Sequence, residues 1–564
     1  MADQQVHKMT TTLGGKPKIA YFSMEIGIDK HIPTYSGGLG ILAGDTIKSC
    51  ADLNVPLVGV TLLLENGYFY QKIDENGQQI ELPIKFDVDN FLKPLPSTTT
   101  VTIEGREVKL RIWCYKVKGI NDYIIPVFFL DSNLDENSEW DRTITKHLYG
   151  GDLKYRLAQE IVLGIGGVRA LQSLGYTTID KYHMNEGHAA LGTLELYRQL
   201  HDIEKVREQF VFTTHTPVAA GHDQFQMDLA RAMLGDMIPE TILPDVTFEN
   251  RLNMTRLALF FSHYVNGVAK KHGEVSRVMF PGYSIDSITN GVHTTTWVSD
   301  AFQKLFDKHM PGWRSDPYIL RSAFSIAKEE VWYAHMVAKK QLIDFVNERN
   351  NAGMNYNDFT IGFARRQTAY KRPDLLISKP DVLVNVAEKA GPIQIIYAGK
   401  AHPNDGSGKE TIKKIYHTMK SIQDKVKMTY IQNYDMTIGK MMTSGVDIWL
   451  NTPRRPREAS GTSGMKAAHN GVPQFSTLDG WWLEGCIENI TGWSIGPEKT
   501  EEAESDDDID RNDLYNKLET WIIPKFYNDR ENWIRTMRSC IAINASFFNT
   551  NRMIQQYVLN AYFM

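Results

Sequence analysis

Four segments of the chain carry more glycine and more polar side chains than simple connectors need. They are residues 35–44 (YSGGLGILAG), 182–188 (YHMNEGH), 363–372 (FARRQTAYKR) and 454–466 (RRPREASGTSGMK). In the last segment, residues 460–464 precede a helix-like stretch, so free backbone amides and the positive end of a helix would face the loop. That arrangement can bind an anion, and an ordinary capped helix start is the alternative.

Lys466 follows this loop among small and apolar neighbours, with no carboxylate nearby in the sequence to pair with it. A buried lysine has a depressed pKa, and its neutral amine can form a Schiff base with an aldehyde cofactor. Pyridoxal phosphate needs both a lysine for its aldehyde and amides for its phosphate. The two features together favour this cofactor, while a solvent-facing side chain stays the alternative for Lys466 alone.

Four cations, Arg365, Arg366, Lys371 and Arg372, lie within eight residues after a predicted strand at 359–363. Arginine suits bidentate phosphate binding and lysine a point-charge contact. We expect a phosphate site here, and a solvated basic turn is the alternative. Near the start of the chain, Gly37, Gly38 and Gly40 could let the backbone approach a ligand closely, or could simply form a tight turn.

The histidines do not suggest a metal site. His183, His188, His215 and His222 are near one another in the sequence, yet the HExxH spacing is absent and no CxxC pair exists. We therefore predict no metal ligand. His215 ends a predicted strand and is interpreted as a substrate contact, with a satisfied buried histidine as the alternative.

Short apolar runs alternate with longer helical patterns along the whole chain, which is typical of crossover units and mainly parallel sheets. The pattern predicts an α/β fold of two lobes. Strands are expected at 18–22, 56–60, 124–130, 210–214, 359–363, 393–398, 428–432, 446–450 and 472–475, with a hairpin over 101–115. Helices are expected at 153–174, 328–347 and 409–427, with Gly164, Gly166 and Gly167 serving close helix packing. The acidic run at 501–510 predicts a solvated loop before the final helices.

Composition bounds the function classes. The 564 residues are 42% hydrophobic and 23% charged, so the chain can bury a large core. A formal charge of −5 argues against nucleic-acid and acidic-membrane partners. The longest apolar stretch is about half of the roughly 20 residues that a membrane span needs. With four scattered cysteines and no signal segment, we expect a cytosolic (cytoplasmic) protein without disulfides.

With these segments assembled, the chain resembles an α-glucan (glycogen, starch or maltodextrin) phosphorylase of the short microbial branch, from about residue 18 to beyond residue 482. The segment 458–466 is similar to that family's pyridoxal phosphate lysine motif, and 35–70 is similar to its glycine-rich loop and the strands that follow. The resemblance implies two Rossmann-like lobes of the GT-B type with an inter-lobe active-site cleft. Residues 1–290 would form a glucan- and phosphate-binding lobe and 291–564 a pyridoxal phosphate lobe, with the final helices packing back on the first lobe as an open option.

The resemblance also implies roles for individual residues. Lys466 would hold the cofactor aldehyde. Its phosphate and ring would contact Arg365, Thr462, Ser463 and Tyr434. Inorganic phosphate would bind Arg366, Lys371 and the Gly38 amide, which also borders the cofactor site. The glucosyl unit would contact Glu458, Ser460, Gly461, Leu39, His215 and Asn290, and the adjoining sugar pocket would be lined by Glu186 and His188. By composition alone, Asn290 would lie in a plain turn.

The chain departs from the better-known long members in a few places. They have Lys at the position of Arg365, a His-Glu pair at Thr368 and Ala369, and Gly-Asn at Ser463 and Gly464. Little precedes Lys18, so the regulatory extension of animal members has no counterpart here, and we expect no phosphorylation or nucleotide control. A homodimer is what the family suggests.

The implied reaction is reversible phosphorolysis of the terminal α-1,4-linked glucose of a glucan, which releases α-glucose 1-phosphate with retained configuration. Two alternatives remain open. A sugar-nucleotide glucosyltransferase could use the same lobes and cationic turn without pyridoxal phosphate. A catalytically silent glucan-binding protein would bind glucan without releasing glucose 1-phosphate.

Overall fold

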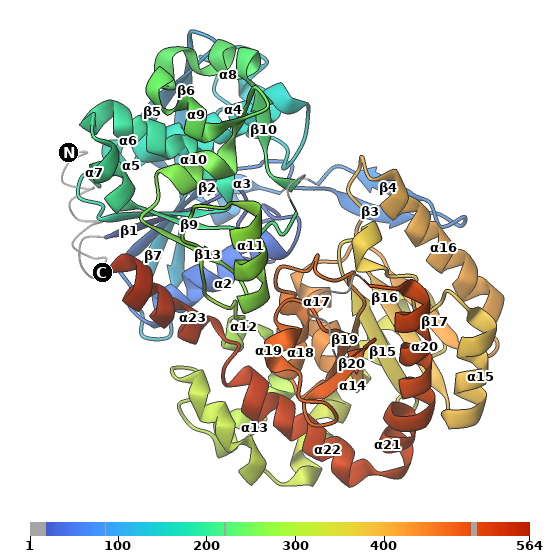
Figure 1. Cartoon of the computed structure of the whole chain (residues 1–564). Coiled ribbons are helices and arrows are strands. Elements are labelled where there is room, and N and C mark those ends of the chain that lie inside the picture. Colours follow the sequence, from blue (N-terminus) through green and yellow to red (C-terminus); the bar gives the residue numbers. More distant parts are fainter. Residues whose placement is uncertain (1–17, 85, 219–220, 498–504, 564) are drawn as a thin grey trace. The chain divides into compact units, whose positions relative to one another are not determined.

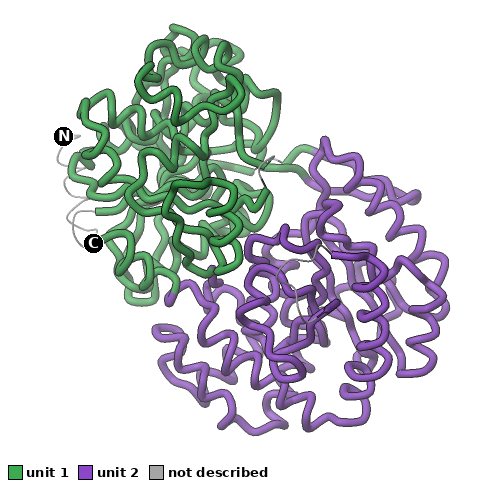
Figure 2. The backbone as a smooth tube through the Cα atoms, viewed as in Figure 1, with its two compact units in different colours: residues 1–69, 83–289, 553–564 green, residues 70–82, 290–552 purple. Residues whose placement is uncertain are grey.

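The computed structural model describes residues 18–84, 86–218, 221–497 and 505–563. Its internal contacts divide the chain into two compact units, coloured in Figure 2. Unit 1 comprises Met1–Phe69, Pro83–Thr289 and Met553–Met564, and unit 2 comprises Tyr70–Leu82 and Asn290–Arg552. A single boundary after residue 290 therefore does not separate the units. Residues 70–82 belong to unit 2, and residues 553–564 belong to unit 1. The functional assignment of the two lobes and their shared cleft stays a prediction.

Unit 1 is built on a nine-stranded sheet in the order β14-β13-β9-β8-β1-β2-β7-β6-β5. Its parallel strands are β14 (Asp286–Ser287), β13 (Tyr264–Gly267), β9 (Phe210–Thr213), β8 (Lys181–Asn185), β1 (Ile19–Ser23), β2 (Leu57–Leu62) and β7 (Ile124–Asp131). The hairpin β5 (Lys93–Ile103) and β6 (Arg106–Lys118) extends one edge in antiparallel fashion. The strands and the hairpin expected in this half are confirmed, with bounds shifted by up to eight residues at the hairpin.

Alternate residues of the strands of unit 1 serve two cores, because successive side chains point to opposite faces of a sheet. Phe22 of β1 lies in one core and Tyr21 in the other. The helical stretch after residue 153 is confirmed as α4 (Leu153–Ile161) and α5 (Gly167–Ser173), joined by a π-helix at Val162–Gly166. A Cβ on Gly164 would lie 2.6 Å from the Gly192 nitrogen, so the expected close helix packing is confirmed.

Unit 2 contains a six-stranded parallel sheet in the order β17-β16-β15-β18-β19-β20. The strands are β15 (Phe359–Ala364), β16 (Ile393–Ala398), β17 (Lys427–Ile431), β18 (Ile448–Asn451), β19 (Gln474–Thr477) and β20 (Gly492–Ile495). Helices cover both faces (Figure 1): α14 (Lys328–Asn350), α17 (Met436–Gly445) and α18 (Thr462–Ala468) share one core, whereas α15 (Pro380–Ala390) and α16 (Gly406–Ile422) share the other. The α/β class and the five predicted strands of this half are confirmed.

Both parallel sheets contain a point at which the strand order reverses. In unit 1 the chain adds β2 on one side of β1 and β8 on the other, so the reversal lies between β1 and β8. In unit 2 it lies between β15 and β18. Loops that leave adjacent strands at such a point diverge, and the crevice outside the carboxyl ends of the strands is where open α/β sheets bind ligands. The four chemistry-bearing segments leave these strands or adjoin them.

One sequence-based expectation is wrong. Of the acidic run, 501–504 lies outside the described residues, but Asp507 begins helix α20 (Asp507–Lys517) and Asp510 is completely buried. These carboxylates pair with the buried Arg372 and Arg455. The sequence of the acidic run itself gives no sign of these partners.

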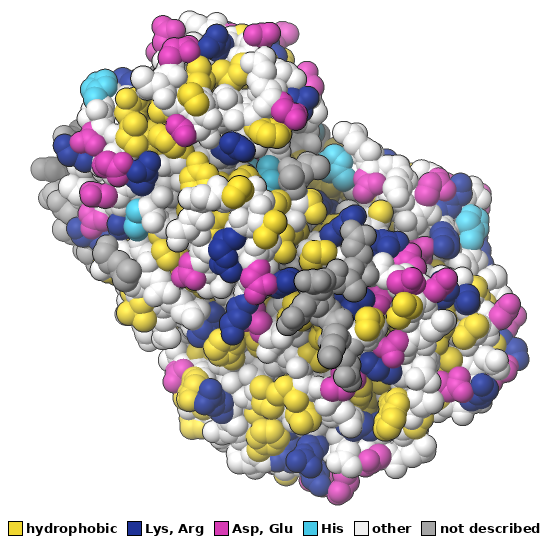
Figure 3. Space-filling view, in the orientation of Figure 1, with side chains coloured by type: hydrophobic (Ala, Val, Ile, Leu, Met, Phe, Trp, Pro, Cys, Tyr) yellow, Lys and Arg dark blue, Asp and Glu magenta, His cyan; other side chains and the backbone are white. Residues whose placement is uncertain are grey.

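Among the described residues, no helix combines the length and apolar character that crossing a membrane requires. On the face drawn in Figure 3, acidic and basic side chains are interspersed and no single broad basic patch is visible.

Candidate functional site

In unit 2, a carboxylate and two cations meet at the reversal point of the sheet. Glu458 Oε2 lies 2.7 Å from Nη2 of Arg365 and 3.1 Å from Nζ of Lys371. Arg365 follows β15 directly, Lys371 ends a 3-10 turn at Ala369–Lys371, and Glu458 belongs to the loop after β18. The two loops come from the two strands that flank the reversal, so the fold itself brings these three predicted residues together.

The three side chains are largely buried, and this decides the charge of Glu458. Burial alone would raise the pKa of its carboxyl, but Arg365 and Lys371 lower that pKa below its usual value. Glu458 is therefore ionised at neutral pH, and its negative charge neutralises part of the combined positive charge of Arg365 and Lys371.

Asp479 supports the loop from behind. It accepts hydrogen bonds from the backbone amides of Glu458 at 2.8 Å and Gly480 at 2.9 Å. Burial raises the pKa of Asp479 to about 7, and the nearby charge of Glu458 adds to the rise.

Lys466 lies on α18, and only 7% of the residue is exposed. The alternative of a solvent-facing side chain is therefore excluded. Its Nζ lies 3.8 Å from the centroid of the Trp297 ring, in a cation–π contact. Gly461 caps the start of α18 with φ +89°, a conformation that favours glycine.

The loop that begins α18 is fixed by close contacts. A Cβ on Gly464 would lie 1.4 Å from Oε1 of Gln474, so a larger residue here would require the Gln474 side chain to move. Ser463 Oγ accepts a hydrogen bond from Nε1 of Trp449 at 3.1 Å. The side chains of Thr462 and Ser463 are partly exposed, which leaves the start of the helix open to a ligand.

Tyr434 is the other predicted neighbour of Lys466. It follows β17, and burial raises the pKa of its phenol far above the usual value. A Cβ on Gly439 would lie 2.9 Å from the Tyr434 hydroxyl and 3.7 Å from the Trp297 ring, so Tyr434 and Trp297 pack against the same point of α17. Since Lys466 lies over Trp297, the structure brings Tyr434 and Lys466 into one neighbourhood.

The remaining predicted residues of unit 2 lie in different settings. Arg366 is exposed, beside the buried Arg365, and no ion pair to it is found within the described part of the chain. Asn290 is 3% exposed, and its carbonyl accepts a hydrogen bond from Arg552 at 3.0 Å. A Cβ on Gly291 would lie 2.1 Å from the Asn549 backbone, so this segment is a packed support and not a plain turn.

Unit 1 holds the glycine-rich loop at the start of α2 (Gly38–Asp52). A Cβ on Gly38 would meet nothing within 4 Å, whereas one on Gly40 would lie 2.7 Å from Oε2 of Glu25. Gly40 is thus a packing requirement, and Gly38 and Leu39 stay accessible at the helix start. Glu25, which sequence reasoning missed, accepts hydrogen bonds from the amides of Ser36 at 2.5 Å and Gly37 at 3.3 Å.

Glu186 and His215 form a second cluster, at the ends of β8 and β9 on the same sheet. Glu186 has φ +72° and ψ 170°, a region nearly exclusive to glycine, and its carboxylate accepts the His215 amide at 2.7 Å and the Thr216 hydroxyl at 3.0 Å. Nε2 of His215 lies 2.6 Å from Oδ1 of Asn185. Burial lowers the pKa of His215 to about 3, so its ring is neutral and Nε2 donates to the amide oxygen. Backbone strain at such a position is typical of functional sites.

His188 continues this cluster toward a set of buried charges. Its Nε2 lies 3.5 Å from Oδ2 of Asp223, and Arg156 Nη2 lies 2.8 Å from the same oxygen. Burial lowers the pKa of His188 to about 3. Burial alone would raise the pKa of Asp223, but Arg156 lowers it, while burial and Asp223 raise the pKa of the fully buried Glu160. One arginine therefore faces two carboxyls whose pKa values are shifted in opposite directions.

Unpaired donors show what the site of unit 2 can bind. Within the described residues, Nη1 of Arg365 and Oγ of Ser460 are buried without a hydrogen-bond partner. A buried donor without a partner costs free energy, so such atoms mark a place that a ligand completes. Together with Lys466 and the open start of α18, they fit a phosphorylated aldehyde such as pyridoxal phosphate.

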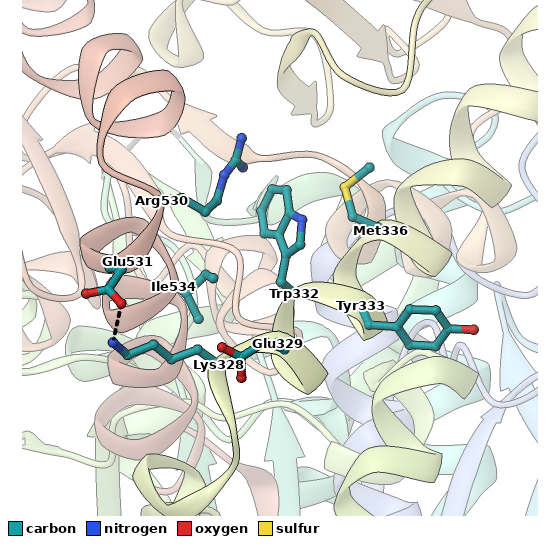
Figure 4. A pocket seen from close by; sticks show the side chains of 8 residues that line it. All are labelled: Lys328, Glu329, Trp332, Tyr333, Met336, Arg530, Glu531 and Ile534. Atoms are coloured by element: carbon teal, nitrogen blue, oxygen red, sulfur yellow. Dashed lines mark ion pairs between the residues drawn. The ribbon is translucent and has the colours of Figure 1, made fainter.

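A surface pocket of about 480 Å³ lies elsewhere on unit 2 (Figure 4). It is lined by Lys328, Glu329, Trp332, Tyr333 and Met336 of α14 and by Arg530, Glu531 and Ile534 of α22 (Arg530–Ser539). The Arg530 guanidinium covers the Trp332 ring at 3.9 Å. This pocket contains none of the predicted site residues, and we assign it no role in the chemistry.

Comparison with known proteins gives consistent matches. Residues 222–492 match the family described as carbohydrate phosphorylase. The chain is 39% identical to a maltodextrin phosphorylase of Thermococcus litoralis, over 96% of this chain and 70% of that protein. It is 33% identical to a glycogen phosphorylase of Mycobacterium tuberculosis, over 96% and 70%, and 32% identical to a glycogen phosphorylase of Aquifex aeolicus, over 97% and 86%.

Proposed function

Because the chain belongs to the carbohydrate phosphorylase family, we propose that it catalyses reversible phosphorolysis of α-1,4-glucans. Inorganic phosphate would take the terminal glucosyl unit and release α-glucose 1-phosphate with retained configuration. The observation that supports this most directly is the convergence of Arg365 and Lys371 on Glu458 at the sheet reversal of unit 2. The two cations could bind phosphate there, and the carboxylate beside them could face a sugar.

The residues of unit 2 divide the work of binding. Lys466 would hold the aldehyde of pyridoxal phosphate, and its phosphate would lie at Arg365, Thr462 and Ser463. Bound there, the cofactor supplies a phosphate as an acid–base group. Lys371 and Arg366 would bind the substrate phosphate and stabilise charge as the glycosidic bond breaks, which in a water-poor site is worth more than in solution.

The residues of unit 1 would recognise the sugar. His215 is neutral, and its ring is oriented by Asn185, so it can take part in hydrogen bonding with a hydroxyl without charging. Glu186 and His188 would contact the adjoining glucose. The accessible Gly38 amide would add a donor to the substrate phosphate, since a helix start favours an anion.

Reduction of the purified protein with tritiated borohydride tests the cofactor assignment. We expect the label on Lys466 and none on Lys339, a buried lysine of the same unit whose Nζ lies 2.5 Å from Asp447. Near-ultraviolet absorbance should shift on reduction. A sugar-nucleotide glucosyltransferase would show neither the label nor the absorbance, and would instead require a nucleotide sugar.

Release of glucose 1-phosphate from maltooligosaccharides and phosphate tests the reaction. A glucan-binding protein without activity would bind the oligosaccharide and release nothing. Full turnover with an unlabelled Lys466 would overturn the cofactor part of the proposal and leave the reaction standing.

A further inference from the structure

Two carboxylates in the first turn of α20 lie against arginines of the turn that carries Lys371 and of the loop that carries Glu458. Asp510 is completely buried, and its Oδ2 lies 2.7 Å from Nη2 of Arg372 while its Oδ1 lies 3.0 Å from Nη2 of Arg455. Asp507 is 2.8 Å from Nη1 of Arg372 and 2.5 Å from Nη2 of Arg454. Two carboxylates thus bridge three arginines.

Two of these arginines are close in sequence to residues of the proposed site. Arg372 directly follows Lys371 in a left-handed conformation with φ +41°, and Arg455 lies three residues before Glu458. Left-handed backbone is costly for arginine, so outside contacts must hold it. Arg372 makes such contacts with its guanidinium, which donates to the carbonyl of Thr452 at 2.8 Å and to that of Pro453 at 3.1 Å.

The two loops are also joined directly. The Arg454 amide donates to the Tyr370 carbonyl at 2.7 Å, and the Thr452 hydroxyl donates to the Lys371 carbonyl at 2.9 Å. These bonds align the turn that carries Lys371 with the loop that carries Glu458. They require Arg372 and Arg455 to stay buried, and buried cations require a counter-charge.

We propose that Asp510, assisted by Asp507, is a positioning residue that holds the Lys371 turn and the Glu458 loop in register. Neither aspartate contacts the substrate sites assigned above. Asp510 would act on the reaction indirectly. By neutralising Arg372 and Arg455, it keeps the Lys371 turn and the Glu458 loop packed against α20. The kinetic part rests on the proposed function, and the structural part does not.

Asp510→Asn tests the proposal, with Asp508→Asn as the matched control. Asp508 is on the same turn of α20, but its side chain is 76% exposed and pairs with Arg511. We expect Asp510→Asn to raise the KM for phosphate and to lower kcat. The ratio kcat/KM for phosphate should fall by about 10- to 100-fold, because small displacements of reacting groups have effects of this size. The KM for maltooligosaccharide should change less than twofold, and Asp508→Asn should match the unchanged protein. Equal changes in both KM values, or none, would overturn the proposal.

Amide hydrogen exchange gives a readout that needs no activity. The Arg454 amide should exchange at least tenfold faster in Asp510→Asn than in the unchanged protein, and its rate should not change in Asp508→Asn. An unchanged exchange rate in both variants would refute the positioning role. If the unchanged protein releases no glucose 1-phosphate, the proposed function fails while this exchange result still decides the positioning role. Should Asp510→Asn not fold, Asp507→Asn takes its place, because Asp507 is 45% exposed and Asp510 then still neutralises Arg372.

Discussion

The Glu458 carboxylate lies 2.7 Å from the Arg365 guanidinium, with side-chain exposures of 10% and 7%. Lys371 approaches the same oxygen. In this structure one carboxylate therefore occupies two cations that are proposed to bind phosphates. An incoming substrate phosphate would have to share Lys371 with Glu458, and this competition has measurable consequences.

Glu458→Gln is expected to separate phosphate binding from turnover. Removing the competing charge should lower the KM for phosphate by about threefold to tenfold, equivalent to about 0.6–1.4 kcal/mol. The loss of a carboxylate that is proposed to face the glucosyl unit should lower kcat by about 100-fold, the scale of removing one placed polar group. Initial rates of glucose 1-phosphate release at varied phosphate measure both. Glu410→Gln, at an exposed position of α16, is the control. A higher KM for phosphate in Glu458→Gln would contradict the competition.

Lys371→Met and Arg366→Met should both raise the KM for phosphate, by about tenfold or more, and lower turnover. Their effects on stability should differ. Lys371 is buried and paired, so its loss should be felt in urea unfolding, whereas the exposed Arg366 should shift the unfolding free energy by less than about 0.5 kcal/mol. Unchanged phosphate kinetics in both variants would show that this turn does not bind phosphate. An effect of Lys371→Met alone would remove Arg366 from the site.

The sequence reveals the sheets and the loops because their signals are local. Apolar runs marked β15 and β18, and the glycine and cation clusters that follow them mark the loops at the reversal point. Lys466 could be singled out because no acidic neighbour in the sequence could pair with it.

Partners far apart in the sequence could not be predicted. Glu25 binds a loop about ten residues away, yet its second partner, the hydroxyl of Tyr149, lies 124 positions on. The acidic run looked like a solvated loop because its counter-charges, Arg372 and Arg455, are more than 50 positions earlier. The spacing of apolar residues along a strand or helix does not reveal which distant residues pair. The residue type at position 186 likewise does not indicate that the backbone of Glu186 is strained.

The conformation of Glu186 predicts a reversal of the usual order of glycine and alanine. Its φ of +72° with ψ 170° costs an L-residue about 1–3 kcal/mol, which glycine avoids. Glycine loses about 0.5–1 kcal/mol through the entropy of the unfolded chain. Glu186→Gly should therefore be more stable than Glu186→Ala by about 1 kcal/mol in urea unfolding, although both lose the carboxylate. At Glu410, on the exposed face of α16, alanine should be the more stable residue of the two by a similar amount. The same order at both positions would show that Glu186 is unstrained.

His215 predicts how acid destabilises the protein. Burial lowers its pKa to about 3 in the folded state, from an ordinary value of 6.5 in the unfolded chain. Between these values the unfolded state binds the extra proton, so this residue's contribution to stability falls as the pH falls, by up to about 1.4 kcal/mol per pH unit. The loss begins near pH 6.5 and is complete near pH 3.

His215→Gln keeps an amide that can donate to Asn185 and removes the titration. The unfolding free energies of the two proteins, measured in urea from pH 7.5 to pH 4.5, should therefore diverge below pH 6.5, with the variant losing less stability. Carboxylates titrate alike in both proteins and cancel in the difference. A difference that does not change with pH would mean that the His215 ring has the same pKa in the folded state as in the unfolded chain, and that the ring proposed to meet the sugar becomes charged below about pH 6.5.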